Sequence, residues 1–124
     1  MRDSGLYRGL SQEMKEIVDY VVGHVNEPLT AADVAREFGM NSDQMSRRVR
    51  EECGYSFPKM VTRAKIIKAK ALLKTTDRSV TEIAYQLSYS SPGQFAVVFR
   101  RETGMSPSAF RKKTEIPKNF LEIH

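Results

Sequence analysis

Two stretches that repeat each other decide the fold: VAREFGMNSDQMSRRVREECGYS at residues 34–56 and IAYQLSYSSPGQFAVVFRRETGMS at residues 83–106. The start of the first superimposes on the start of the second at a shift of 49 residues, and the remainder superimposes at a shift of 50. The pairs at 49 are Val34–Ile83, Ala35–Ala84, Phe38–Leu87, Met40–Tyr89 and Ser42–Ser91, and those at 50 are Met45–Phe95, Val49–Phe99, Arg50–Arg100, Glu52–Glu102, Gly54–Gly104 and Ser56–Ser106. One unit therefore occurs twice, with a single residue inserted in the second turn.

Each copy reads as a short helix, a tight turn, a second helix and a glycine stop. Capping-box patterns precede the short helices, Thr30 with Asp33 and Ser79 with Glu82. Asn41 or Ser42 is expected to cap the second helix of the first copy, and Ser91 with Pro92 starts that of the second copy. No segment shows sustained strand alternation, so the sequence predicts an all-α protein with two helix-turn-helix units.

The segments around the repeats are also helical in pattern. A helix capped by Ser11 carries apolar residues at three- and four-residue spacing through Val25, and Pro28 closes it. A long helix over residues 57–74 is apolar on several faces, as expected of a helix between two packed units. The predicted organisation is a tail at 1–10, a first helix-turn-helix subdomain at 11–56, a linker helix at 57–74, a second subdomain at 75–113 and a tail at 114–124.

Composition excludes several classes of protein. With 124 residues, 40% hydrophobic and 28% charged, the chain is an ordinary globular protein without a transmembrane or signal segment. The single cysteine, Cys53, rules out an internal disulfide and a multi-cysteine zinc site. No phosphate loop, paired histidines or nucleophile motif is present, so we expect no enzyme, no cofactor and no metal. These features predict a cytoplasmic location.

Positive charge is concentrated in the middle of the chain. Residues 47–74 hold nine basic and two acidic groups, whereas residues 1–46 hold four and eight. Such a region is either a phosphate-binding surface or a solvated basic helix face. A helix over 57–74 would span about 27 Å at about 1.5 Å per residue. Successive major grooves on one face of DNA lie about 34 Å apart, so the two second helices are expected to enter successive grooves.

One run of residues resembles a known family. It comprises Ile83-Ala84, Leu87-Ser88-Tyr89, Phe95, Phe99-Arg100-Arg101, Gly104-Met105-Ser106-Pro107 and Phe110-Arg111. Together with Arg63, Ala69, Leu72 and Leu73 in the linker helix, it makes residues 11–113 resemble the DNA-binding domain of the AraC/XylS transcriptional regulators. The resemblance implies about seven helices, two helix-turn-helix units and a role in transcription, most often as an activator.

The resemblance also implies which residues of the first unit read bases: Asp43, Ser46 and Arg47, with Gln44 reaching adenine or a phosphate. Arg47 is the main candidate, because arginine can bind guanine O6 and N7 with two hydrogen bonds. The alternatives are that Arg47 is solvated surface and that Asp43 only complements the helix dipole.

The second unit departs from the family pattern. Val97 stands where the repeat places Arg47, so the candidate guanine reader is absent there. Gln94 and Val97 are the expected base contacts of this helix, Gln94 through hydrogen bonds and Val97 through a thymine methyl group. Ser88 replaces the usual turn glycine, which predicts a strained or differently shaped turn. We therefore expect the first unit to specify the sequence and the second to position the protein through phosphates. The predicted phosphate contacts are Ser42, Arg48, Arg50, Arg63, Ser91, Arg100 and Arg101, with Arg63 alternatively an internal arginine between the units.

The function predicted from these observations is sequence-specific regulation of transcription through double-stranded DNA. RNA polymerase is the expected protein partner, and no membrane partner is expected. The chain is either a small regulator or the C-terminal part of a larger, effector-responsive one, whose missing N-terminal domain would supply dimerisation. The alternative function is a protein-interaction adaptor or anti-regulator with weakened DNA binding.

Overall fold

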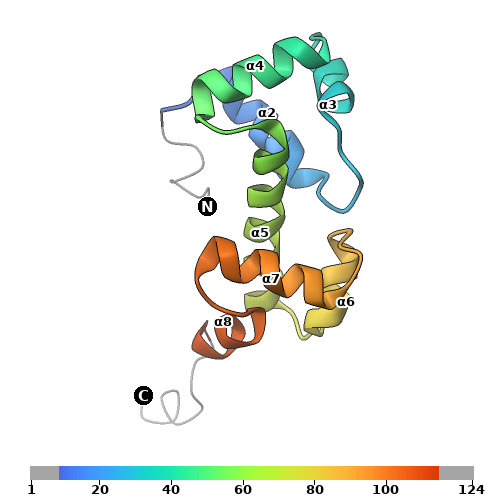
Figure 1. Ribbon diagram of the computed structural model, residues 1–124, viewed down its shortest axis with the longest axis vertical. Coiled ribbons are helices and arrows are strands. Elements are labelled where there is room, and N and C mark those ends of the chain that lie inside the picture. The colour runs from blue at the N-terminus through green and yellow to red at the C-terminus, as the bar shows by residue number, and fades with distance from the viewer. Residues whose placement is uncertain (1–8, 115–124) are drawn as a thin grey trace. The chain divides into compact units, whose positions relative to one another are not determined.

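The computed structural model describes residues 9–114, which form seven helices and no strand (Figure 1). This confirms the all-α prediction for that part of the chain. Within the same residues, no helix combines the length and the apolar character needed to cross a membrane. The chain divides into two compact units, Met1–Lys68 and Ala69–His124. The predicted tails fall mostly on residues 1–8 and 115–124, which lie outside the described residues.

The first unit contains α2 (Gln12–Gly23), α3 (Ala31–Glu37), α4 (Ser42–Cys53) and the beginning of α5 (Phe57–Thr75). Each of the first three helices begins where its cap predicts. The Ser11 hydroxyl accepts the Met14 amide, and Thr30 and Asp33 form a reciprocal capping box. The predicted caps Ser11 and Thr30 are therefore confirmed.

The first helix ends earlier than its apolar pattern predicted. The expected helix continued through Val25 to Pro28, whereas α2 ends at Gly23 with His24 as its C-cap. The His24 amide donates to the carbonyl of Val21 at 3.1 Å, which tightens the last turn and stops the helical ladder. Val25 is still buried, so its apolar side chain correctly indicated a core position although the residue is not helical.

The core of the first unit is formed by the apolar faces of these four helices. Its buried helical side chains are Met14, Ile17, Val18, Val21, Val34, Ala35, Met45, Val49, Phe57, Met60, Ala64 and Ile66, and Leu10 and Val25 join them from outside the helices. All of them are apolar, so burial removes hydrocarbon from water without desolvating a polar side chain. Since α4 contributes Met45 and Val49 to this core, its opposite face is left to solvent.

The second unit contains the end of α5 together with α6 (Val80–Gln86), α7 (Pro92–Thr103) and α8 (Pro107–Thr114). Ser79 and Glu82 form the predicted capping box of α6. Ser91 caps α7 and Pro92 occupies its first turn, also as predicted.

Aromatic rings fill the core of the second unit. Tyr89, Phe95, Phe99 and Phe110 form a continuous series with centroid separations of 5.3, 5.7 and 5.5 Å. These distances lie in the favourable range for tilted and edge-to-face aromatic pairs. The series packs α7 against the turn before it and against α8.

Arg111 binds backbone carbonyl oxygens at the C-terminal end of α5. Its Nε donates to the carbonyl oxygen of Leu73 at 3.0 Å, and a terminal guanidinium nitrogen donates to that of Thr76 at 3.1 Å. The last carbonyls of a helix have no partner inside the helix, and an arginine can satisfy them from outside. Arg111 therefore has a structural role in the second unit.

The two units use the same turn between their paired helices. Gly39 has φ 69° and Ser88 has φ 65°, both in the left-handed region. The Met40 amide donates to the Ala35 carbonyl at 2.9 Å, and the Tyr89 amide donates to the Ala84 carbonyl at 3.0 Å. The second turn thus keeps the shape of the first, and Ser88 carries the left-handed strain that glycine avoids.

The caps locate the inserted residue. The equivalent N-caps of α4 and α7 are Asn41 and Ser91, which lie 50 residues apart. Because the turns superimpose through Met40 and Tyr89 at a shift of 49, the extra residue is Ser90. The pairing of Ser42 with Ser91 suggested by the sequence is therefore wrong, since Ser42 is the first residue of α4 and Asn41 is its cap.

Candidate nucleic-acid interface

The exposed face of α4 carries the predicted base-reading residues of the first unit. Asn41 and Gln44 form a capping box in which each amide donates to the other's side-chain oxygen, at 3.0 and 2.8 Å. The helix ends at Gly54, whose φ of 80° suits a left-handed cap. Between these ends, the solvent-exposed residues are Ser42, Asp43, Gln44, Ser46, Arg47, Arg50 and Glu51.

Arg47 and Arg50 lie three residues apart on that face, so their side chains are neighbours on the helix surface. Both are exposed. Asp43 lies in the first turn of α4, where the helix dipole favours a negative charge. The face therefore combines an acid near the helix start with two arginines farther along.

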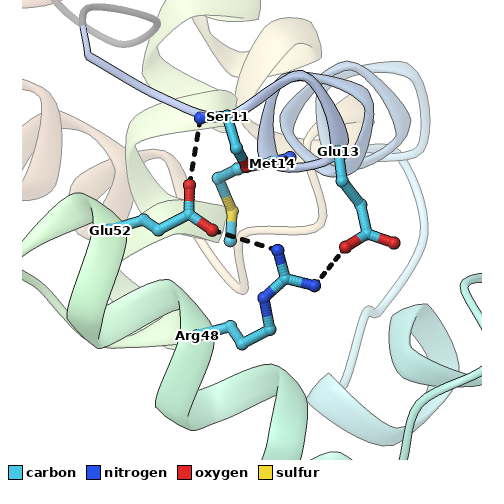
Figure 2. Close-up of polar contacts among 5 residues, drawn as sticks. All are labelled: Ser11, Glu13, Met14, Arg48 and Glu52. Atoms are coloured by element: carbon cyan, nitrogen blue, oxygen red, sulfur yellow. Dashed lines mark hydrogen bonds and ion pairs between the residues drawn. The ribbon is translucent and has the colours of Figure 1, made fainter.

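Arg48 is bound within the first unit, because its guanidinium lies between two carboxylates (Figure 2). It contacts Glu13 of α2 and donates to Glu52 of α4 at 3.1 Å. These bonds raise the pKa of Arg48. Arg48 thus bridges two helices of the first unit, unlike Arg47 and Arg50 on the exposed face, and its phosphate contact stays a prediction.

Glu52 connects the same cluster to the start of α2. Its other carboxylate oxygen accepts the Ser11 amide at 3.0 Å. Burial by itself would raise the pKa of Glu52, but the hydrogen bonds from Ser11 and Arg48 outweigh burial, and the pKa is lowered. Glu13, Arg48 and Glu52 thus fasten α4 to α2, a role that the sequence reasoning missed.

Arg63 lies on α5 with its guanidinium carbon 4.8 Å from the centre of the Tyr55 ring. This is a cation–π distance. Burial raises the pKa of Tyr55 to about 12, while the nearby charge of Arg63 acts in the opposite direction. Both residues belong to the first unit, and the proposed phosphate contact of Arg63 stays a prediction.

The exposed face of α7 is chemically different from that of α4. Buried Phe95 and Phe99 fix the orientation of the helix, as Met45 and Val49 do in α4. The equivalent of Arg47 is Val97, which is 67% exposed. Its exposed companions on α7 are Gly93, Gln94, Arg100 and Arg101.

The basic residues of α7 lie near the C-terminal end of the helix. Arg100 is exposed and is the repeat equivalent of Arg50. Arg101 places its Nε 3.5 Å from a carboxylate oxygen of Glu102. Val97 and Arg100 therefore give α7 an apolar and a cationic position where α4 has two arginines.

Gln94 is held by the turn that precedes α7. Its amide donates to the Ser91 hydroxyl at 3.0 Å, as expected at an N-cap. Its side-chain oxygen accepts both the amide and the hydroxyl of Ser90, at 3.0 and 2.7 Å. The sequence reasoning singled out Gln94 but missed Ser90, although the change of repeat shift from 49 to 50 was a signal for an added residue in this turn.

Comparison with known proteins is consistent with this arrangement of two similar units. A family model described as a helix-turn-helix domain matches residues 34–113. The HTH-type transcriptional activator RhaS of Enterobacter sp. (strain 638) is 30% identical over 115 residues, which cover 90% of this chain and 41% of that protein. The chain thus spans about two fifths of the length of this relative.

Two solved structures show the same fold. The C-terminal domain of AraT, a response regulator from Geobacillus stearothermophilus, is 28% identical with a TM-score of 0.74, covering 88% of this chain and 91% of that one. The DNA-binding domain of AdpA, a global transcriptional factor solved in complex with a target DNA, is 29% identical with a TM-score of 0.71, covering 83% and 93%.

Proposed function

Because the chain belongs to the AraC-type helix-turn-helix family, we propose that it regulates transcription by binding specific double-stranded DNA sequences. In this proposal α4 and α7 are recognition helices that enter successive major grooves. The observation that carries it is that both helices bury one apolar face and expose the other, at equivalent positions of one repeated unit. The AdpA domain, solved with its target DNA, supports the DNA-binding part of the proposal.

The first unit supplies most of the sequence reading in this proposal. Arg47 binds the O6 and N7 acceptors of a guanine, since its guanidinium is exposed and planar. Asp43, Gln44 and Ser46 face the neighbouring bases. Arg50 and the start of α4 at Ser42 contact phosphates.

The second unit positions the protein. Val97 offers an apolar contact to a thymine methyl group, which discriminates weakly. Arg100, Arg101 and the start of α7 at Ser91 contact phosphates, as does Arg63 on α5. Arg48 is the weaker candidate for a phosphate contact, because two carboxylates already bind its guanidinium.

The complete protein is proposed to be longer than a DNA-binding domain, because RhaS extends well beyond the matched region. An additional domain would sense an effector and supply dimerisation. We infer activation through contact with RNA polymerase as the output, and the cytoplasm as the site of action. The chain acts by binding and not as an enzyme.

An adaptor function is the second candidate, and the exposure of Val97 favours it. A branched apolar side chain that is 67% exposed at a reading position suits a protein contact as well as a base contact. Under this alternative, α7 binds a protein and only α4 retains contact with DNA.

Selection of bound sites from a random duplex library tests the proposal. We expect a two-part motif with half-sites about 10 base pairs apart, one strongly and one weakly defined. Failure to enrich any sequence, with binding that disappears as salt rises, would contradict sequence-specific recognition and favour the adaptor.

Three variants separate reading from positioning. Arg47→Ala is expected to relax preference at one base pair by about 1–3 kcal/mol. Arg47→Lys is the charge-matched control, which keeps the non-specific electrostatic attraction to DNA but loses the bidentate guanine contact. Arg100→Ala is expected to weaken binding to all sequences alike and to reduce the salt slope by about 1. A uniform loss for Arg47→Ala together with a selective loss for Arg100→Ala would mean that the roles are reversed.

A further inference from the structure

The turn before α7 contains a residue that controls what Gln94 can recognise. Ser90 is the residue inserted in the second unit, and it donates twice to the same oxygen of Gln94. The backbone amide donates at 3.0 Å and the hydroxyl at 2.7 Å. A carboxamide oxygen has two lone pairs, so Ser90 occupies both acceptor positions of Gln94.

The first unit lacks this pair of hydrogen bonds to one glutamine oxygen. The side-chain oxygen of Gln44 accepts the Asn41 amide at 3.0 Å, and this is the acceptor bond that its capping box provides. Gln44 consequently keeps one lone pair for a ligand. The difference arises from the inserted residue, because the cap of α4 lies directly after the turn whereas Ser90 separates the turn from the cap of α7.

The occupied oxygen changes the bases that Gln94 can read. A glutamine recognises adenine by accepting from the N6 amino group with its oxygen while donating to N7 with its nitrogen. To do so, Gln94 would have to give up its bonds to Ser90. Losing two hydrogen bonds costs about as much free energy as one bidentate base contact contributes to discrimination. The preference for adenine is therefore cancelled.

The side-chain nitrogen of Gln94 keeps both hydrogens for a ligand. Guanine presents two acceptors, N7 and O6, in the major groove, whereas adenine presents one acceptor and one donor. A group that only donates therefore favours guanine. The orientation of the amide follows from its bonds, since the amide and hydroxyl of Ser90 donate to an oxygen and the amide nitrogen could not accept them.

We propose that Ser90 is a specificity-determining residue, which orients Gln94 as a hydrogen-bond donor and so makes the second recognition helix select guanine over adenine. The inference rests on the proposed function, because it requires α7 to lie in a major groove. Ser90 acts through Gln94 and is a positioning residue.

The test is site selection from a random duplex library with the whole chain, in four versions: wild type, Gln94→Ala, Ser90→Ala and Ser90→Thr. The base pair whose preference changes with Gln94→Ala identifies the position that Gln94 reads. We expect wild type to prefer guanine there. Ser90→Ala removes one of the two donors and should raise the ratio of adenine to guanine by roughly two- to tenfold, the value of one hydrogen bond.

Ser90→Thr is the matched control, because it retains the hydroxyl and should restore the preference for guanine. Helix content and thermal melting are measured for each variant, since a general loss of fold would lower affinity for all sites without changing a base ratio. Ser90→Ala keeps the Ser91 cap and the hydrogen bond that the backbone amide of residue 90 donates to Gln94, so it is expected to fold.

Three results would overturn the inference. A wild-type preference for adenine at the Gln94 position would show that the oxygen is available. A uniform loss of affinity for Gln94→Ala would place Gln94 on a phosphate, and an unchanged ratio for Ser90→Ala would remove Ser90 from the recognition. Absence of any enriched motif in wild type would refute the proposed function itself, whereas a clear motif with any of these three results refutes only the role of Ser90.

Discussion

The ion-pair cluster between α2 and α4 permits a quantitative prediction for Arg48→Met. Methionine keeps the apolar stem of the side chain but removes its contacts with Glu13 and Glu52. The side chains of Arg48 and Glu52 are 33% and 24% exposed and that of Glu13 is 45% exposed, so water screens the pair with Glu13 more than the pair with Glu52. An exposed pair contributes about 0.2–1 kcal/mol. With two pairs at this partial burial, we expect the free energy of unfolding to fall by about 1–2 kcal/mol.

Urea unfolding followed by circular dichroism measures this loss. With a slope of about 1.5 kcal/mol per molar urea, the midpoint should fall by about 1 M. A double-mutant cycle with Glu52→Gln isolates the pair and should give a coupling of about 0.5–1 kcal/mol at low salt. A coupling of zero at low salt, or one that is unchanged at 1 M NaCl, would refute the electrostatic explanation.

The cluster also predicts a dependence on pH. Since the pKa of Glu52 is lowered in the folded protein, its contribution is fully present above the unfolded value of about 4.3. The contribution is lost as the pH falls through the lowered folded pKa. The cost of Arg48→Met should therefore be constant between pH 6 and 8 and become smaller below about pH 4. A cost that persists in acid would point to lost packing instead of lost charge.

Five further substitutions, grouped in three tests, examine the backbone and the helix ends by thermal or urea unfolding. Gly54→Ala, at φ 80°, should destabilise by about 1 kcal/mol, whereas Gly23→Ala, in open space on a helix, should stabilise by about 0.5 kcal/mol, so equal signs would be contrary to expectation. Ser88→Gly, at φ 65°, should stabilise by about 0.5 kcal/mol through relief of strain, and a loss would show that the serine side chain matters more. Arg111→Met should cost about 1–3 kcal/mol by freeing the carbonyls at the end of α5, while its exposed neighbour Lys112→Met should stay within about 0.5 kcal/mol.

Local chemistry made most of the fold predictable from the sequence. A capping box depends on two residues that are three positions apart, and a glycine stop depends on one residue. Both can therefore be recognised from a short segment of sequence. Thr30, Ser79 and Ser91 are confirmed as caps for this reason. The repeated apolar positions likewise indicated the buried faces of both recognition helices.

What the sequence left open depends on contacts between distant segments. Arg48 meets Glu13 across 35 residues, and no local pattern distinguishes it from its neighbour Arg47. The end of α2 was also misplaced, because the apolar spacing continues to Val25 although the helix stops at Gly23. Hydrophobic periodicity reports burial, and burial persists after a helix ends.

The internal repeat separates what the fold requires from what it leaves free. Val49 and Phe99 are both buried, and Gly54 and Gly104 both adopt positive φ, so packing and backbone geometry account for these similarities. Arg47 and Val97 are both exposed at equivalent positions, and neither helix needs its particular residue to form.

A difference that folding does not explain must be sought in what the surface binds. Ser90 strengthens this conclusion, because the second turn contains an extra residue and Ser91 still caps α7. Its consequence falls on the side chain of Gln94. The two units therefore share one framework and present two different surfaces, as expected of a single chain that recognises an asymmetric site.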